Sequence, residues 1–222
     1  MPHFPDPWAA DPNGIVAFGM DLEPETLLEA YRNGAFPWPI PGLPLPWFSP
    51  DPRAILEFHR IHVPRSLRQA RKSAKLSLTV DRDFAGVMEG CAAAPRPGPP
   101  GTWITAEMIR AYVRLHRLGH AHSAEAWEAG RLVGGVYGVL VDGSFSAESM
   151  FYRVPNASKL ALLHLVDRLR DRGLTWMDIQ TLSPHMQRLG ARQVPREEFL
   201  RLLAASRARA GASPLVRGPE NP

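Results

Sequence analysis

Apolar residues recur every three to four positions in three segments of the second half of the chain. This period brings the apolar side chains onto one face of a helix. It predicts helices over residues 105–119 and 157–171, and a last helix that begins after Pro195. Thr105 is a suitable cap for the start of the first helix, and Gly173 follows the end of the second.

The segments between these helices are predicted to be strands. Those at 120–127, 131–140 and 144–151 are separated only by Glu128-Ala-Gly130 and Asp142-Gly143, which are typical of hairpin turns. A further strand is predicted at 174–180. The order helix, antiparallel meander, helix, strand, helix is that of the acetyltransferase fold. We therefore predict an α/β (α+β) fold class, with a mixed sheet in an acetyltransferase-like C-terminal domain.

The N-terminal part of the chain has a less regular pattern. Residues 1–50 are predicted to form loops around one helix that begins near Pro24 and ends at Gly34. The aromatic and proline-rich stretch after it is too rigid for a linker, and we expect it to form a packed wall. Short strands and helices follow at 54–58, 65–74, 76–80 and 83–92.

A Pro- and Gly-rich segment at 95–101 marks the predicted domain boundary. We predict an N-terminal subdomain over residues 1–100 and a catalytic domain over 101–210. The polar tail at 211–222 is predicted to be disordered.

Composition sets limits on the class of protein. The 222 residues are 45% hydrophobic and 22% charged, which is ordinary for a globular protein. No apolar run reaches the ~18–20 residues that span a bilayer, and the N-terminus lacks the pattern of a secretory signal. We therefore expect a cytoplasmic protein without a membrane partner. Cys91 is the only cysteine, which excludes a disulfide framework.

Motifs for nucleotide or metal chemistry are missing from the sequence. There is no Walker loop, no dinucleotide-binding glycine pattern after a strand, and no Gly-x-Ser-x-Gly elbow. His116, His120 and His122 lie close together, but a metal site would need more ligands. Hydrogen-bonded or surface histidines are the simpler interpretation, so we expect neither a metal nor a cofactor.

Three polar residues form the main candidate site. Asp178 and Gln180 are two apart on a predicted strand, so their side chains share one face at its C-terminal end. Glu148 lies late in the third strand of the meander. If these two strands are neighbours, the three polar groups converge. A solvated strand face is the alternative.

A one-sided run of basic residues lies between Phe58 and Val80, where no acidic residue occurs. The positive net charge of +4 adds a mild preference for anionic partners. This pattern favours contact with a phosphate backbone, although a solvated helix face would look the same. The candidate residues are Arg65, Arg68, Arg71, Lys72 and Lys75.

Ordered motifs from about residue 13 to residue 203 resemble one family, the leucyl/phenylalanyl-tRNA–protein transferases of bacteria. Any single motif is weak, but so many in order are very specific. They are Leu27–Gly34, Phe36-Pro-Trp38, Trp47–Arg53, Gly101–Thr105, Gly119–Ser123, Leu132–Gly138, Glu148–Phe151, Asn156–Lys159, Asp178-Ile-Gln180 and Leu189-Gly-Ala191.

The resemblance implies a family-specific N-terminal subdomain and an aminoacyl transfer reaction. Leu-tRNA or Phe-tRNA, and more weakly Met-tRNA, would donate the amino acid. A protein with an N-terminal Arg or Lys would accept it and become marked for degradation by the N-end rule. The residues that would line the active region are Glu148, Asp178, Gln180, Trp38 and Trp103.

Roles for these residues follow as hypotheses. The carbonyl oxygen of Gln180 accepts a hydrogen bond from the attacking amine, Asp178 fixes the Gln180 amide, and Glu148 attracts the basic side chain of the acceptor. The two tryptophans sandwich the terminal adenine of the tRNA or wall the pocket. Further residues expected to bind substrate, or simply to fill the core, are Tyr31, Phe145, Met150 and Met177.

Two other functions remain open at this point. An acyl-CoA-dependent N-acetyltransferase would share the C-terminal fold, but its pyrophosphate loop is normally rich in glycine. The corresponding segment, residues 153–158, has none. A tRNA-binding protein without activity would not need Glu148, Asp178 and Gln180 together.

Overall fold

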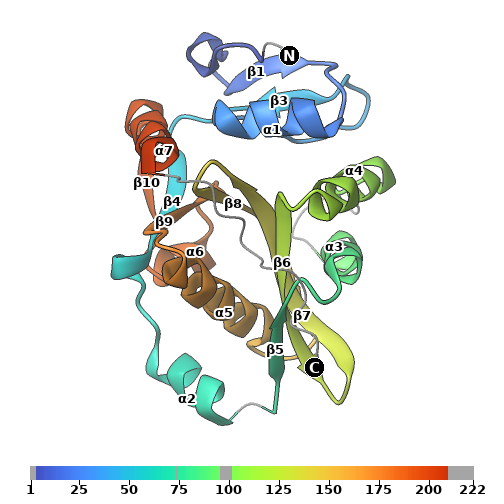
Figure 1. Ribbon diagram of the computed structural model, residues 1–222, viewed down its shortest axis with the longest axis vertical. Coiled ribbons are helices and arrows are strands. Elements are labelled where there is room, and N and C mark those ends of the chain that lie inside the picture. The colour runs from blue at the N-terminus through green and yellow to red at the C-terminus, as the bar shows by residue number, and fades with distance from the viewer. Residues whose placement is uncertain (1–3, 74, 96–101, 210–222) are drawn as a thin grey trace.

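The computed structural model describes residues 4–73, 75–95 and 102–209 (Figure 1). The described residues form a three-stranded sheet in the order β1-β3-β2 and a seven-stranded sheet in the order β10-β4-β9-β8-β7-β6-β5. The tail at 211–222, predicted to be disordered, lies outside the described residues.

The helices and strands of the described residues are as follows. The strands are β1 (Ile15–Phe18), β2 (Phe36–Pro37), β3 (Pro46–Phe48), β4 (Arg53–Glu57), β5 (Ser77–Val80), β6 (Ala121–Glu128), β7 (Arg131–Val141), β8 (Ser144–Tyr152), β9 (Trp176–Gln180) and β10 (Arg192–Val194). The α-helices are α1 (Pro24–Arg32), α2 (Arg65–Ser73), α3 (Phe84–Ala93), α4 (Ala106–Arg117), α5 (Ala157–Asp171), α6 (Pro184–Arg188) and α7 (Arg196–Arg209). Short 3-10 helices lie at Pro7–Ala9 and Phe58–Arg60.

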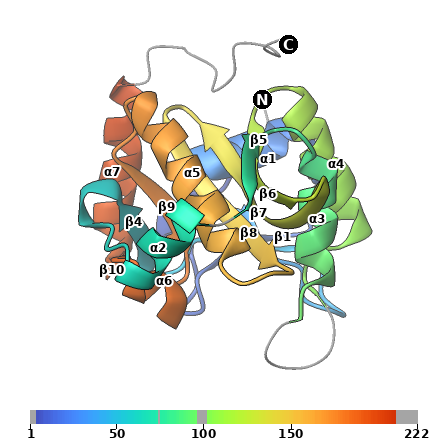
Figure 2. The same cartoon turned by 90° about the horizontal axis from the view of Figure 1, so that it is seen from below.

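The large sheet is mixed, as the sequence predicts. Strands β5 to β8 form an antiparallel meander, β9 runs parallel to β8, and β4 and β10 are antiparallel to their neighbours. Helix α5 covers one face and α3 and α4 cover the other (Figures 1 and 2). Apolar side chains form a core cluster on each side: Leu162, Leu165 and Leu169 of α5 belong to one, Met108 and Tyr112 of α4 to the other.

Both predicted hairpin turns are present in the meander. Ala129 and Gly130 have φ of 48° and 76°, and Asp142 and Gly143 have φ of 47° and 76°. Two consecutive residues with positive φ match the right-handed twist of the flanking strands, which is why Gly stands second in each turn. These turns fix the register of β6, β7 and β8.

The small sheet lies with α1 at one end of the molecule (Figure 1). Leu27 and Tyr31 of α1 are buried in the same core cluster as α4, so the N-terminal unit packs directly on the catalytic half.

The described part of residues 1–50 contains the three strands β1, β2 and β3 besides the predicted helix. The loop prediction failed because strands of two to four residues with several prolines show no alternation.

Strands β4 and β5 belong to the large sheet although both lie within residues 1–100. Along the chain, the change from the small sheet to the large one therefore falls between Phe48 and Arg53. Two short elements, α6 and β10, were also not predicted. Within the described residues, no helix is long and apolar enough to cross a bilayer.

Candidate active site

The three polar candidates meet where β8 and β9 run side by side. These strands are parallel and pair at Ser146 and Asp178. Two residues further along each strand, Gln180 Nε2 donates a hydrogen bond of 2.6 Å to Glu148 Oε1. Glu148, Asp178 and Gln180 are 8%, 1% and 3% exposed, so they form a buried group and not a solvated strand face. We call these three residues the β8–β9 cluster.

Asp178 has four hydrogen-bond donors around its carboxylate. Arg53 donates from Nε to Oδ1 at 2.8 Å and from Nη2 to Oδ2 at 2.6 Å. Ser146 Oγ lies 3.0 Å from Oδ2, and the backbone N–H of Gln180 lies 2.8 Å from Oδ1. Asp178 thus holds the backbone of Gln180, whereas the hypothesis had it fixing the side-chain amide. That role falls to Glu148.

Arg53 is part of the site, although the sequence analysis gave it no role. It is 1% exposed. Besides Asp178, it reaches the carbonyl oxygen of Gly34 from Nη1 at 3.0 Å, and its guanidinium lies 4.7 Å from the Phe36 ring centre and 4.5 Å from that of Phe199. Its position directly before the apolar run Ala54-Ile-Leu56 was the available signal.

The Glu148 carboxyl group has a pKa raised to about 8. Burial is the main cause, because it disfavours the charged form, and the nearby Asp178 carboxylate adds to the effect. Hydrogen bonds with Tyr31 and Gln180 and the positive charge of Arg53 act in the opposite direction. Within the described part of the chain, no hydrogen bond of standard geometry satisfies Glu148 Oε2. This buried oxygen is therefore the atom of the cluster that is left to interact with a substrate group.

Tyr31 lies beside Glu148 and forms a hydroxyl pair with Tyr112 of α4. The two phenolic oxygens are 2.5 Å apart and buried, and burial raises the pKa of both residues well above the ordinary value. The expected substrate-binding residue Tyr31 is thus held against the acidic group of the cluster. Its hydroxyl connects helix α1 of the N-terminal unit to that group.

The two tryptophans expected to bind the adenine stack on each other. The ring centres of Trp38 and Trp103 are 4.7 Å apart, with 18° between the ring planes. A base therefore has no space between them, and a sandwich would require the rings to separate.

The apolar candidates differ in exposure. Phe145 and Met177 are 0% exposed and belong to the core cluster beneath α5, whereas Met150 is only partly buried. Of these three, Met150 alone presents surface outside the core.

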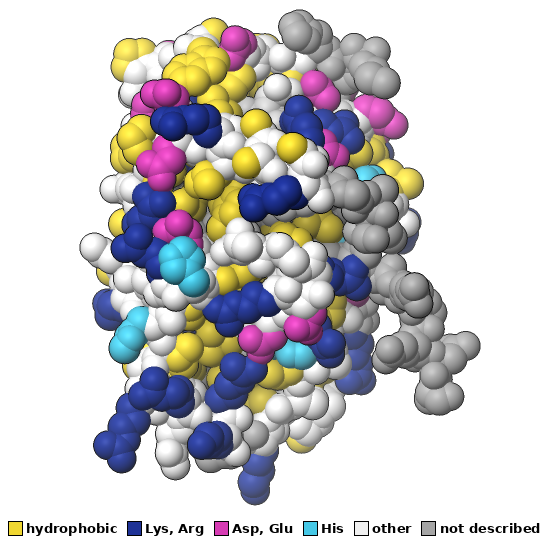
Figure 3. Space-filling model, turned by 60° about the vertical axis from the view of Figure 1, so that its left-hand side comes forward, with side chains coloured by type: hydrophobic (Ala, Val, Ile, Leu, Met, Phe, Trp, Pro, Cys, Tyr) yellow, Lys and Arg dark blue, Asp and Glu magenta, His cyan; other side chains and the backbone are white. Residues whose placement is uncertain are grey.

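The basic candidates of α2 are all exposed. Leu67 is the buried residue that anchors the helix, while Arg65, Arg68, Arg71 and Lys72 face solvent, as does Lys75 beyond its end. Arg71 forms an ion pair of 2.5 Å with Asp167 of α5. Lys and Arg side chains gather over the lower part of the face in Figure 3, where α2 lies.

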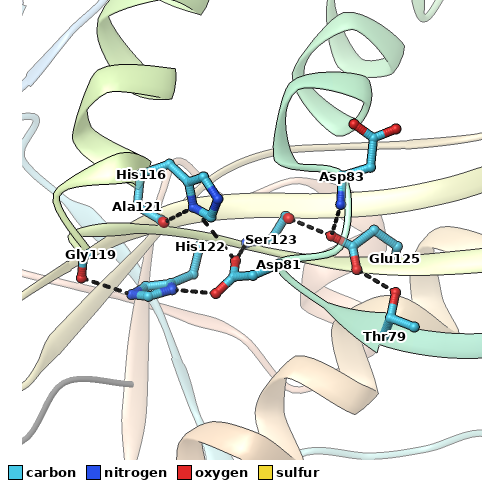
Figure 4. A network of polar contacts seen from close by, with 9 residues as sticks. All are labelled: Thr79, Asp81, Asp83, His116, Gly119, Ala121, His122, Ser123 and Glu125. Carbon is cyan, nitrogen blue, oxygen red and sulfur yellow. Dashed lines mark hydrogen bonds and ion pairs between the residues drawn. The ribbon is translucent and has the colours of Figure 1, made fainter. Parts of the chain in front are cut away.

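The histidines considered as metal ligands have ordinary hydrogen-bond partners. His122 contacts Asp81 Oδ2 at 2.7 Å and the carbonyl oxygen of Gly119 at 3.1 Å, and His116 contacts the carbonyl oxygen of Ala121 at 2.7 Å (Figure 4). Across the residues that the structure describes, no group of three or more His, Cys, Asp or Glu could hold a metal ion.

Two models of one protein family match the chain on either side of Arg53. The model described as "Leucyl/phenylalanyl-tRNA protein transferase N-terminal domain" matches residues 20–51, and "Leucyl/phenylalanyl-tRNA protein transferase" matches residues 55–204. The chain belongs to the leucyl/phenylalanyl-tRNA protein transferase family. It is therefore an aminoacyltransferase, and the resemblance carried by its motifs is confirmed.

Relatives in this transferase family match almost the whole chain. The leucyl/phenylalanyl-tRNA–protein transferase of Anaeromyxobacter dehalogenans (strain 2CP-C) is 50% identical over 217 residues, which are 98% of this chain and 91% of that protein. The corresponding transferase of Nitratidesulfovibrio vulgaris (strain DP4) is 50% identical over 200 residues, 90% of this chain and 86% of that protein.

Solved structures with a similar fold include two GCN5-related acetyltransferase folds. One, from Kribbella flavida, is 12% identical, has a TM-score of 0.39, and covers 75% of this chain and 58% of its own. The other, from Streptococcus suis, is 17% identical, has a TM-score of 0.38, and covers 65% and 57%. The predicted α/β (α+β) fold class with a mixed sheet is confirmed by the element order and the seven-stranded sheet of the structure. At such TM-scores the likeness says nothing of activity.

Proposed function

We propose that this transferase moves leucine or phenylalanine, and methionine more weakly, from tRNA to the N-terminal Arg or Lys of an acceptor protein. The observation that carries the proposal is the Glu148–Gln180 hydrogen bond in the β8–β9 cluster. Because Glu148 holds the Nε2 end of the amide, the Oε1 end of Gln180 remains available to a substrate amine.

The proposed reaction is the aminolysis of an activated ester. The neutral α-amine of the acceptor attacks the acyl carbon, the bond to the ribose oxygen breaks, and the proton released by the amine ends on that oxygen. An α-amine has a reference pKa of ~7.7–8, so a useful fraction is neutral near physiological pH. Catalysis then rests mainly on holding amine and ester together, with Gln180 orienting the lone pair of the nitrogen. We propose no cofactor or metal.

A basic acceptor fits the unsatisfied carboxyl oxygen of Glu148, because a cation beside this group lowers its pKa and favours its charged form. Glu148 Oε2 has no hydrogen-bond donor of standard geometry in the described part of the chain, and the guanidinium or ammonium group of an N-terminal Arg or Lys would supply one. Glu148→Gln should therefore weaken the use of Arg-starting peptides. Unchanged acceptor kinetics in this variant would refute the assignment.

The remaining candidates divide between the two ends of the donor substrate. We propose that the terminal adenine stacks on the outer face of the Trp38–Trp103 pair, with Met150 beside the aminoacyl side chain. The exposed residues of α2 and Lys75 would contact tRNA phosphates, where each neutralised phosphate adds about one unit to the salt dependence of binding. With these substrates, we expect the activity to be cytoplasmic and to mark proteins for degradation by the N-end rule.

A direct assay tests the proposal. The purified protein is mixed with radiolabelled Leu-tRNA and a protein that begins with Arg, without CoA, ATP or added metal. After the tRNA ester has been hydrolysed by heating, label should remain on this acceptor but not on a matched one that begins with Ala. No transfer from Leu-, Phe- or Met-tRNA would overturn the proposal.

A further inference from the structure

Arg53 lies in the short connection between the two segments that the family models match, residues 20–51 and 55–204. Its side chain contacts both of them. On one side, Nη1 donates to the carbonyl oxygen of Gly34, directly after the helix that carries Tyr31. On the other side, Nε and Nη2 hold both carboxylate oxygens of Asp178.

The contacts of Arg53 continue to the amide of Gln180. Asp178 Oδ1 accepts the backbone N–H of Gln180 at 2.8 Å. Gln180 has a φ of 61°, in the left-handed region, which is unfavourable for a residue other than glycine and persists only where the surroundings impose it. The Asp178 carboxylate, fixed by Arg53 and Ser146, is one such constraint. In this backbone conformation the side chain of Gln180 reaches Glu148.

We propose that Arg53 is a positioning residue. It fixes the Asp178 carboxylate and thereby the left-handed backbone and the amide of Gln180, and it couples this geometry to the docking of the N-terminal unit. The positioning of Asp178 and Gln180 by Arg53 rests on the hydrogen bonds of these residues. Only the expected effect on turnover rests on the proposed function.

A lysine cannot replace Arg53 in this position. The guanidinium is a planar fork that makes two parallel hydrogen bonds to a carboxylate, and its central carbon lies over the rings of Phe36 and Phe199. An ammonium group keeps the charge but makes a single-point contact. Arg53→Lys therefore removes the orientation of Asp178 without leaving a buried carboxylate wholly unpaired.

Arg196 offers a matched control. It is also buried, at 8% exposed, and it contacts the chain just before Arg53: Nε donates to the carbonyl oxygen of Ser49 at 3.0 Å, and its backbone N–H to Asp51 Oδ1 at 3.0 Å. Arg196→Lys loses a buried hydrogen bond near the same connection but leaves Asp178 untouched. Loss of stability alone should therefore affect both variants in the same way.

The test compares Arg53→Lys with Arg196→Lys by NMR and by kinetics. The side-chain NH₂ signals of Gln180, assigned by their loss in Gln180→Ala, report the hydrogen bond to Glu148 without any substrate. We expect Arg53→Lys to shift these signals and to lower kcat about tenfold or more, with the KM for Leu-tRNA nearly unchanged. Arg196→Lys should change neither. Unshifted Gln180 signals, or a kcat within twofold of that of Arg196→Lys, would overturn the proposal.

A milder variant covers the case in which Arg53→Lys does not fold. Phe199→Leu removes one ring from the guanidinium but keeps the ion pair, so the same NMR shift should appear at smaller size, with kcat about threefold lower. Unshifted Gln180 signals in this variant would also overturn the proposal. If the wild type itself transfers no amino acid, the proposed function fails while the NMR comparison still decides the role of Arg53.

Discussion

Two groups of buried or partly buried polar side chains lie on the same sheet and differ in how fully they are hydrogen-bonded. One is the β8–β9 cluster. The other, here called the β5–β6 network, consists of Thr79, Asp81, His122, Ser123 and Glu125 (Figure 4). In the network, Glu125 accepts from Ser123 Oγ at 2.5 Å and from Thr79 Oγ1 at 2.6 Å, and Asp81 from the Ser123 N–H at 2.8 Å and from His122.

Burial and backbone strain do not distinguish these two groups. Glu125 is 0% exposed, less than Glu148, and Asp81 has a left-handed φ of 56°, much like Gln180. What differs is one carboxyl oxygen: each carboxylate oxygen of the network has a donor, whereas Glu148 Oε2 has no partner of standard geometry among the described residues. A satisfied network stabilises the fold, whereas an open one has capacity left for a substrate.

Removal of the side-chain amide of Gln180 should have the largest effect on activity. Gln180→Ala is expected to lower kcat about 100-fold, because the attacking amine loses the group that orients it, while tRNA affinity stays nearly unchanged. Single-turnover transfer and filter binding of Leu-tRNA measure the two quantities. Gln187→Ala, on the surface of α6, is the control. A parallel fall in tRNA affinity would mean that Gln180 binds and does not orient.

The matching change in the β5–β6 network should act on stability instead. Glu125→Ala leaves the hydroxyls of Thr79 and Ser123 without their acceptor, so we expect the free energy of unfolding to fall by about 2 kcal/mol. Turnover per folded molecule should stay the same. Urea denaturation and an active-site titration measure this, with the exposed Glu128→Ala as control. A loss of turnover without a loss of stability would mean that the network, like the β8–β9 cluster, acts in the reaction.

The raised pKa of Glu148 should make the free energy of unfolding depend on pH. Between pH 4.5 and about 8 the folded protein keeps a proton that the unfolded chain has lost, so the free energy of unfolding falls as the pH rises through this range. Glu148→Gln has no such proton, and its slope should be smaller by up to ~1.4 kcal/mol per pH unit. Urea unfolding at several pH values measures both slopes. Equal slopes would contradict the raised pKa.

The smallest effect is expected for tRNA binding by α2, at a distance from both groups. Arg68→Gln on α2 should weaken Leu-tRNA binding slightly and reduce the slope of log affinity against log salt by about one unit. Turnover at saturating tRNA should not change. Arg117→Gln, exposed on α4, is the control that tests for a general charge effect. An equal loss in both variants would remove α2 from the proposed tRNA surface.

Long periodic segments made much of the fold predictable from the sequence. Helix α5 lies at Ala157–Asp171, as predicted, and the meander follows from two turns whose glycines adopt positive φ. The strands of the small sheet and β10 span only two to four residues, so no periodicity reveals them.

Part of the candidate site was also predictable, from the spacing of residues along a strand. Asp178 and Gln180 share a strand, and their meeting with Glu148 required only that β8 and β9 be neighbours. Arg53 and Asp178 are 125 positions apart, and no local pattern connects them. The stacking of Trp38 on Trp103 and the pairing of Tyr31 with Tyr112 likewise depend on tertiary packing.

The strand order of the large sheet has a consequence for the time course of folding. Strands β6, β7 and β8 are joined by two tight turns, so their contacts are local and can form while the rest of the chain is still being synthesised. Strand β9 must instead pair with β4, from early in the chain, and with β8 across a whole helix. We therefore expect a nascent chain to display a meander well before it can join Glu148 to Gln180. Transfer activity should appear only after β9 has left the ribosome, late in synthesis.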